Sequence, residues 1–323
     1  TGYQRLAALV NINSPLKLGD QFQVRGLITD EDLRNIKLSY RVPAGGSGWV
    51  LGGSWSDVHY ELGREFGVLQ AHGWSRVGTL TASYPLLRSL ERNVLLTLSY
   101  DRKSFLDRFD VTDPDVVGRK HSKIASVGLN GYGTLFSGAT YAFATVLSQG
   151  HLFLDSAEQR AQDAATARTA GTFTKLVATG YGTMPLTQNW SLFGSAYGQR
   201  ASKNLDSSER LSLGGVAGVR AYPQGEATGD EGYIFSAEAR YALPLRSLQL
   251  AGFVDVGGIR YNKFALSAPN SRFLRGTGLS ATWAPRADMV LKLMMATRLG
   301  EQEVKSEPSD ARTRWWLQYL WRF

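Results

Sequence analysis

Few residues in this 323-residue chain have the types and spacing of a catalytic site. The absence of cysteine excludes disulfides, thiolate metal sites and cysteine nucleophiles. Four histidines lie far apart, without the spacing of metal ligands: His59, His72, His121 and His151. His121 could pair with Asp113 or Asp115, and His151 with Asp155, but no nucleophile elbow accompanies either pair. We expect loop or strand-end histidines, and we expect no enzyme, metal or cofactor.

A glycine-rich stretch at 214–232 carries a different kind of chemistry. Its middle holds a single arginine, Arg220, between Val219 and Ala221. Six glycines allow positive φ and close backbone packing, and apolar residues give the stretch something to pack with; these are Gly214, Gly215, Gly218, Gly225, Gly229, Gly232, Val216, Val219, Tyr222 and Pro223. A loop of this length is usually functional or disordered. We predict that this one is folded.

A carboxylate that could receive Arg220 lies on the predicted strand 247–258. Alternation places Leu248, Leu250, Val254 and Val256 on one face, and Phe253, Asp255 and Gly257 on the other. A carboxylate on an inner face needs a partner or water. A guanidinium can bind it through two parallel hydrogen bonds. From these residues alone, a hydrated Asp255 and an exposed Arg220 remain the alternative.

Strand-like alternation extends along the whole chain and predicts an all-β protein. The segments are long, and aromatic residues recur at the ends of their apolar faces, which is typical of a transmembrane antiparallel β-barrel rather than a soluble sandwich. We predict fifteen strands: 3–13, 19–29, 33–42, 48–60, 73–84, 92–103, 121–133, 136–149, 171–184, 188–200, 232–243, 247–258, 273–284, 287–299 and 312–323.

The connections are of two kinds. Short turns rich in Pro, Gly or Asn are predicted at 13–16, 43–47, 85–88, 185–188, 244–246 and 284–286. Longer polar loops are predicted at 61–72, 104–120, 150–170, 201–232, 259–272 and 300–311, with a short helix in the alanine-rich part of 156–168. In such barrels the short turns are periplasmic and the long loops external.

The strand number and the composition limit what kind of protein this can be. Fifteen strands would make the first and last parallel, whereas bacterial single-chain barrels have even numbers, so we expect sixteen in the complete protein. The chain opens at Thr1 without a signal peptide, and no apolar run is long enough for a transmembrane helix. The net charge of +8 comes from scattered residues, which argues against nucleic-acid binding.

Two motifs resemble the outer-membrane-protein-85 superfamily. Val219, Arg220, Ala221 and Tyr222 look like the Val-Arg-Gly-Tyr motif of its loop six, with Ala221 where glycine is usual. Phe253, Asp255 and Gly257 match its Phe-x-Asp-x-Gly motif. Residues 13–20, 60–63 and 83–89 look like the TpsB branch, the two-partner secretion transporters.

The resemblance implies a sixteen-stranded barrel with loop six folded into the lumen and Arg220 paired with Asp255. It also implies that 1–323 is the barrel translocator domain, preceded by a missing first strand, a plug helix and POTRA domains. Lys37, Arg41, Glu238 and Arg240 face inward and are expected to form a hydrated lumen lining.

We therefore predict a monomeric, integral outer-membrane pore that exports a large unfolded TpsA-like exoprotein (adhesin, haemolysin or contact-dependent toxin) from periplasm to cell surface, with outer-membrane lipid around it. The alternatives are a barrel-assembly or insertase member of the same superfamily, a passive porin and a rim enzyme.

Overall fold

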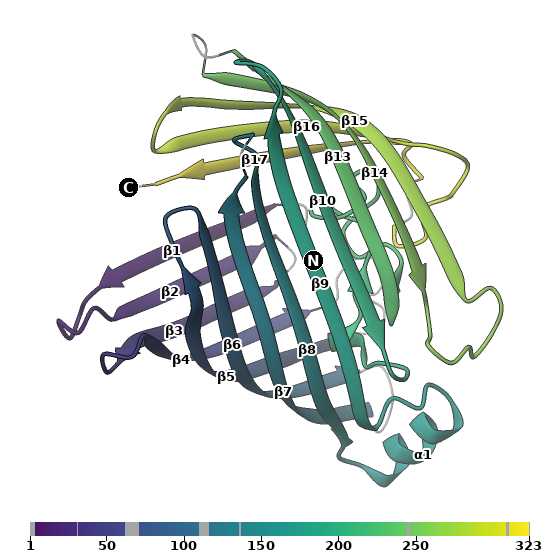
Figure 1. The fold of residues 1–323 in the computed structure, drawn as a ribbon. Helices are drawn as coiled ribbons and strands as arrows, with labels where there is room; N and C mark the ends of the chain where they lie inside the picture. The colour runs from purple at the N-terminus through teal and green to yellow at the C-terminus, as the bar shows by residue number, and fades with distance from the viewer. Residues whose placement is uncertain are drawn as a thin grey trace. The chain divides into compact units, whose positions relative to one another are not determined.

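The computed structural model describes residues 4–30, 32–61, 71–109, 116–135, 137–243, 247–307 and 310–322, and it is made almost entirely of β-strands (Figure 1). None of the helices in these ranges is long and apolar enough to cross a membrane. The elements are β1 (Arg5–Asn13), β2 (Gln21–Thr29), β3 (Arg34–Ala44), β4 (Trp49–Glu61), β5 (Ala71–Arg88), β6 (Arg92–Phe109), β7 (Val116–Thr134), β8 (Thr140–Leu154), α1 (Ala157–Ala165), β9 (Gly171–Pro185), β10 (Trp190–Ala201), the 3-10 turn η2 (Ser207–Glu209), β11 (Leu211–Ser212), β12 (Thr228–Gly229), β13 (Glu231–Leu243), β14 (Leu248–Arg260), β15 (Ser271–Arg286), β16 (Met289–Arg298) and β17 (Thr313–Trp321).

Fifteen of these strands form one sheet in chain order, and β11 pairs with β12 apart from it. Every pairing whose register is described is antiparallel. The fifteen-stranded antiparallel prediction is therefore confirmed, with strand bounds within a few residues for most strands. The match follows from the period-two alternation, which β14 shows clearly. Leu250 and Val254 are 43% and 46% exposed, whereas Phe253 and Asp255 are 3% and 0% exposed.

Two connections differ from the prediction. β5 continues to Arg88, so the turn expected at 85–88 lies at 89–91 instead. The loop expected at 104–120 is shorter because β6 and β7 continue into it. Polar residues can extend a strand beyond its apolar band, since backbone pairing does not depend on side-chain polarity. The turn expected at 244–246 lies outside the described residues.

The helix predicted in the alanine-rich loop is present as α1. Ser156 is its N-cap, and the Ser156 hydroxyl accepts a hydrogen bond from the Gln159 backbone N–H. In the other direction, the Gln159 side-chain oxygen accepts one from the Ser156 backbone N–H. This capping box satisfies two backbone donors that a helix start leaves unpaired. A nine-residue helix without buried residues depends on such local bonds.

The chain divides into two compact units. The first comprises 1–88, 94–129 and 147–174, and its turn before β2 is built around Asp20. The Asp20 carboxylate is 2% exposed and accepts the Leu18 N–H at 3.1 Å and the Tyr40 hydroxyl at 2.8 Å. Burial disfavours ionisation of Asp20, but these donors outweigh it and hold the pKa of Asp20 below its ordinary value.

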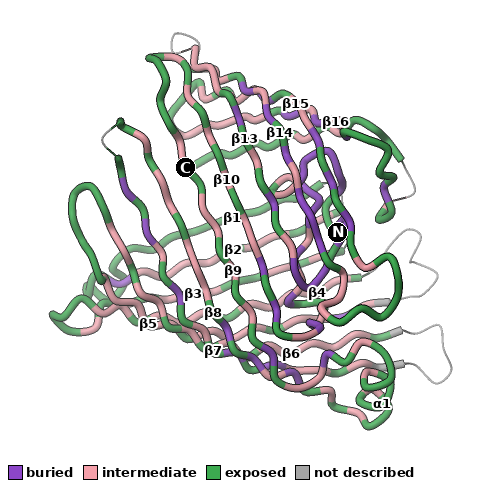
Figure 2. Tube along the Cα trace, turned by 45° about the vertical axis from the view of Figure 1, so that its right-hand side comes forward, coloured by how far each residue is buried: buried purple, intermediate pink, exposed green. Residues whose placement is uncertain are grey.

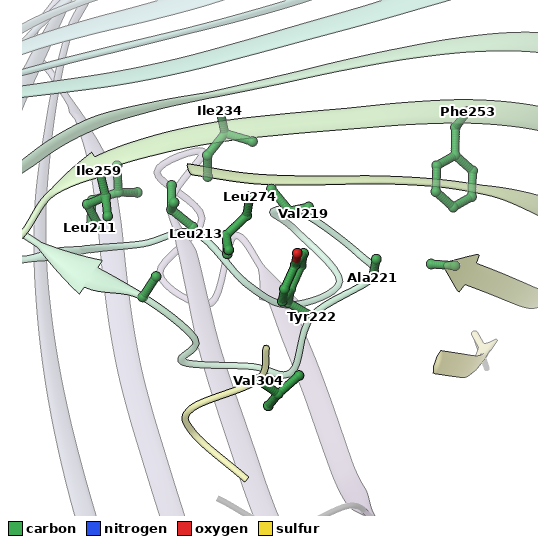
Figure 3. Packing of buried hydrophobic residues seen from close by; sticks show 12 residues of the cluster. Leu211, Leu213, Val219, Ala221, Tyr222, Ile234, Phe253, Ile259, Leu274 and Val304 are labelled. Atoms are coloured by element: carbon green, nitrogen blue, oxygen red, sulfur yellow. The ribbon is translucent and has the colours of Figure 1, made fainter. Parts of the chain in front are cut away.

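The second unit comprises 89–93, 130–146 and 175–323. Most of the buried residues among those that the structure describes belong to this unit (Figure 2). Its core is formed where the loop at 202–230, here called loop six, packs on one face of β13–β16. Figure 3 shows loop residues Leu213, Val219 and Tyr222 beside Ile234 and Leu274 of the sheet. The buried face of these strands is therefore the face that loop six covers.

Candidate functional site: an anchored inner loop

Loop six is itself a hairpin. Leu211 and Ser212 of β11 pair with Gly229 and Thr228 of β12. The ladder continues as the Leu213 N–H donates to the Ala227 carbonyl at 3.1 Å and the Gly214 N–H to the Glu226 carbonyl at 3.0 Å. Beyond it the chain turns back tightly, with Gly215 at a φ of 116° and the Val219 N–H bonded to the Leu213 carbonyl at 2.7 Å. Internal hydrogen bonds thus give the loop a fixed shape.

Two strand glycines let the hairpin tip reach the sheet. A Cβ at Gly257 would meet Leu213 and Val219 side-chain atoms at 3.1 and 3.2 Å. A Cβ at Gly276 would lie 2.5 Å from the Ala221 methyl. The absence of these side chains allows the apolar tip to pack directly on the strand backbone. The neighbouring Gly258 instead lies under the Tyr233 ring.

Arg220 at the tip binds Asp255 of β14 through both carboxylate oxygens. Its Nε donates to Oδ2 at 2.9 Å and its Nη2 to Oδ1 at 2.7 Å, and its backbone N–H also donates to Oδ2 at 3.1 Å. Arg220 is 5% exposed and Asp255 is fully buried. A bidentate pair fixes the direction as well as the distance of the guanidinium.

The remaining guanidinium donors are also used. Nη1 donates to Glu238 of β13 at 2.6 Å, and Nη2 to the Ser236 hydroxyl at 2.8 Å. The Phe253 ring lies 3.5 Å from the guanidinium carbon, a cation–π contact. Arg240 holds the second Glu238 oxygen at 2.7 Å. Glu238 is thus buried in the anchor, so its expected place in a hydrated lumen lining is wrong.

A tryptophan of the last strand completes the anchor. The Trp316 indole N–H donates to the Arg220 carbonyl at 2.8 Å. The backbone of Arg220 therefore contacts β14 through its N–H and β17 through its carbonyl. This contact links the hairpin tip to both ends of the strand group β14–β17.

A second anchor joins loop six to the loop between β16 and β17. The fully buried carboxylate of Glu226 pairs with Arg272 of β15 and accepts the backbone N–H groups of Lys305 at 3.1 Å and Ser306 at 2.9 Å, together with the Ser306 hydroxyl. Burial raises the pKa of Glu226, but these donors outweigh burial and hold it below its ordinary value.

A third anchor joins the base of loop six to the loop between β14 and β15. Asp230 is fully buried and accepts the Lys263 N–H at 2.8 Å and the Leu205 N–H at 3.1 Å. Asn204 exchanges hydrogen bonds with the Phe264 backbone. Burial is the largest effect on Asp230 and raises the pKa of its carboxyl despite these donors.

The histidines considered as candidate catalytic residues have other partners in the structure. The His121 Nδ1 lies 3.0 Å from Asp155, and Asp113 and Asp115 lie outside the described residues. His151 contacts the Thr172 hydroxyl at 2.9 Å instead of Asp155. Among the described residues no group of three metal-ligating side chains comes together.

The structure brings together every motif residue singled out from the sequence: Val219, Arg220, Ala221, Tyr222, Phe253, Asp255 and Gly257. Five further residues of the anchors were not predicted from the sequence: Ser236, Trp316, Glu226, Arg272 and Gly276. Ser236 could have been found, because it shares a face with Glu238 at period two. The others become partners only once separate loops fold onto one sheet face. The chemical role that this arrangement supports is mechanical: the buried Arg220–Asp255 ion pair holds the tip of loop six in one position.

Comparison with known proteins assigns the family. The family model for haemolysin secretion/activation protein ShlB/FhaC/HecB matches residues 1–281. Heme/hemopexin transporter protein HuxB of Haemophilus influenzae (strain 86-028NP) is 26% identical over 309 residues, which are 93% of this chain and 54% of HuxB. Outer membrane transporter CdiB of Dickeya dadantii (strain 3937) is 25% identical over 274 residues, covering 81% of this chain and 48% of that protein.

Solved structures show the same fold. CdiB from Escherichia coli superposes with a TM-score of 0.76 at 19% identity, over 99% of this chain and 60% of that chain. CdiB from Acinetobacter baumannii gives 0.71 at 17% identity, over 98% and 56%. BamA from Haemophilus ducreyi gives 0.66 at 13% identity, over 99% and 68%.

The protein is a transmembrane β-barrel of the bacterial outer membrane. It belongs to the ShlB/FhaC/HecB family of haemolysin secretion/activation proteins. The chain spans about half the length of the curated relatives it matches.

Proposed function

We propose that the protein is the outer-membrane pore of a two-partner secretion system. It exports a large partner exoprotein, of the adhesin, haemolysin or contact-dependent toxin kind, unfolded from periplasm to cell surface. It works as a monomer surrounded by outer-membrane lipid, and as a transporter rather than an enzyme. Its barrel follows periplasmic POTRA domains that recognise the exoprotein. Family membership and the relatives named as transporters support this proposal.

The observation that carries the proposal is the anchored loop. A passive porin needs no loop tip held by a buried bidentate ion pair, a cation–π contact and a tryptophan hydrogen bond together. A buried pair of this kind is costly to break, because one uncompensated charge remains. The arrangement suits a loop with two positions, one of which is strongly fixed. We propose that loop six occupies the pore at rest and leaves this position during export.

The test is secretion by the protein as the cell makes it, carrying Arg220→Ala or Arg220→Lys. Arg220→Ala should keep the barrel, whose strands pair independently of the guanidinium, but release the tip and reduce secretion by at least tenfold. Arg220→Lys should be nearly as defective, since lysine cannot form the two-oxygen contact. Arg286→Ala, which changes an exposed arginine at the end of β15, is the matched control. Normal secretion by both Arg220 variants at normal membrane levels would refute the role of the anchor.

A further inference from the structure

A groove of about 1270 Å³ lies at one end of β9, β10, β13, β14 and β15. Its lining includes residues of both sheet faces, and on the face opposite loop six apolar side chains stay exposed: Tyr233 is 42% and Phe273 43% exposed. In a transmembrane barrel this face meets lipid. The end in question carries loop six and the loop between β14 and β15, whereas the opposite end carries short turns. By the usual rule for these barrels, the groove faces the external leaflet.

The floor of the groove follows from strand register. Ala178, Gly198, Tyr233, Gly258 and Phe273 pair in sequence across the five strands and form one row. The Tyr233 ring lies over Gly258, where a Cβ would come within 2.9 Å of it. Tyr233 therefore leans away from Gly198, and a Cβ at Gly198 would meet no atom within 4 Å. The result is an open apolar channel over Gly198 and Ala178, bordered by an aromatic ring.

The rim of the groove is basic. Two residues further toward the strand ends, and so on the same face, Arg200 pairs in register with Leu176, and Arg260 with Glu231. Glu231 holds Lys263 at 2.8 Å and Arg260 at 3.2 Å. Arg200, Arg260 and Lys263 against Glu231 alone leave an excess of two positive charges. The Arg260 side chain remains 52% exposed despite its ion pair, so it can accept a further anionic partner.

We propose that this groove binds a phosphorylated, acylated lipid of the external leaflet. An acyl chain would lie in the channel over Gly198 and Ala178. A headgroup phosphate would lie against Arg200 and Arg260, because guanidinium groups match phosphate oxygens in pairs. Basic side chains at a membrane surface attract anionic headgroups in the same way. The apolar floor would therefore contact the acyl chain of such a lipid, and the adjoining basic rim would contact its phosphate headgroup.

The experiment measures lipid retention by native mass spectrometry of the delipidated protein in detergent. The probe is lipid A, a bis-phosphorylated, multiply acylated disaccharide, and phosphatidylcholine and inorganic phosphate are the comparisons. Arg200→Gln with Arg260→Gln should weaken lipid A binding at least tenfold, and Gly198→Leu should weaken it by filling the channel. Gly194→Leu, on the same strand and face where a Cβ also meets open space, and Arg286→Gln should leave binding unchanged.

Two results would overturn the site. Equal retention of lipid A by all variants would show binding elsewhere on the barrel. Displacement of lipid A by inorganic phosphate alone would show a phosphate contact without an acyl groove. If Gly198→Leu does not fold, as judged by circular dichroism, the double arginine variant decides. The proposal does not depend on export, and secretion by the variants is not its readout.

Discussion

Glu226 controls a contact between two loops that the family motifs do not mention. Its carboxylate accepts hydrogen bonds from the Lys305 and Ser306 backbone N–H groups and forms an ion pair with Arg272. These contacts hold the pKa of Glu226 below its ordinary value. A depressed carboxyl pKa contributes stability that is complete above the unfolded pKa of 4.5 and is lost as pH falls through the folded pKa. The contribution of Asp230 to the free energy of unfolding has the opposite sign. Burial raises the pKa of Asp230, so its ionised form is unfavourable in the folded protein.

We predict that acid weakens the Glu226 contact and that Glu226→Gln removes this pH dependence. In the native protein the melting temperature should fall as the pH drops below about 4.5, since the carboxylate must take up a proton to be released. Glu226→Gln should melt lower at the higher pH and change less on acidification. Thermal unfolding followed by tryptophan fluorescence measures both. The control is Glu91→Gln, whose residue lies exposed in the turn between β5 and β6. Parallel curves for the native protein and Glu226→Gln would contradict the prediction.

At the scale of elements, loop six and β15 fit each other through one pair of small residues. Gly276 of β15 lies opposite the Ala221 methyl group of loop six. Ala221 does not have a positive φ, so the methyl group is tolerated by the backbone. What limits this position is the space that Gly276 leaves. Ala221 and Gly276 thus form one steric unit shared by a loop and a strand.

We predict that Gly276→Ala destabilises the protein by about 1–3 kcal/mol, the usual cost of overpacking. The new Cβ would lie 2.5 Å from the Ala221 methyl. Adding Ala221→Gly should restore most of this loss, whereas Ala221→Gly alone should cost little. Denaturant unfolding of the two single variants and the double variant gives the coupling energy. If the two changes simply add, loop six does not press on Gly276.

The elements were predictable to different degrees for physical reasons. Long strands repeat a period-two pattern often enough to be recognised, and β14 shows it from Leu250 to Gly257. β11 and β12 have two residues each, too few for any period to appear. Asp255 could be predicted as a partner because an inward carboxylate needs one. Glu226 could not, because its burial depends on the loop between β16 and β17, which lies about eighty positions further along the chain.

For the whole molecule, the decisive question is whether loop six closes the conducting path. Three anchors hold the loop: Arg220 with Asp255, Glu226 with Arg272, and Asp230 with the Lys263 backbone. The first is at the tip and the others are nearer the base, so losing the first frees the tip without releasing the whole loop. Removal of one member of a buried ion pair costs about 3–5 kcal/mol. This is enough to favour tip release by more than a hundredfold, since 1.4 kcal/mol corresponds to a factor of about ten.

We therefore predict that Arg220→Ala and Asp255→Ala have the same effect on planar-bilayer conductance. The native protein should be mostly closed, and both variants should open or fluctuate alike, because each removes the same contact from a different side. Arg286→Ala, remote from loop six, should behave as the native protein. If all these proteins conduct identically, loop six does not limit the pore, and a passive porin becomes the better description. If only Arg220→Ala opens, Arg220 acts through Glu238, and Asp255 is not its anchor.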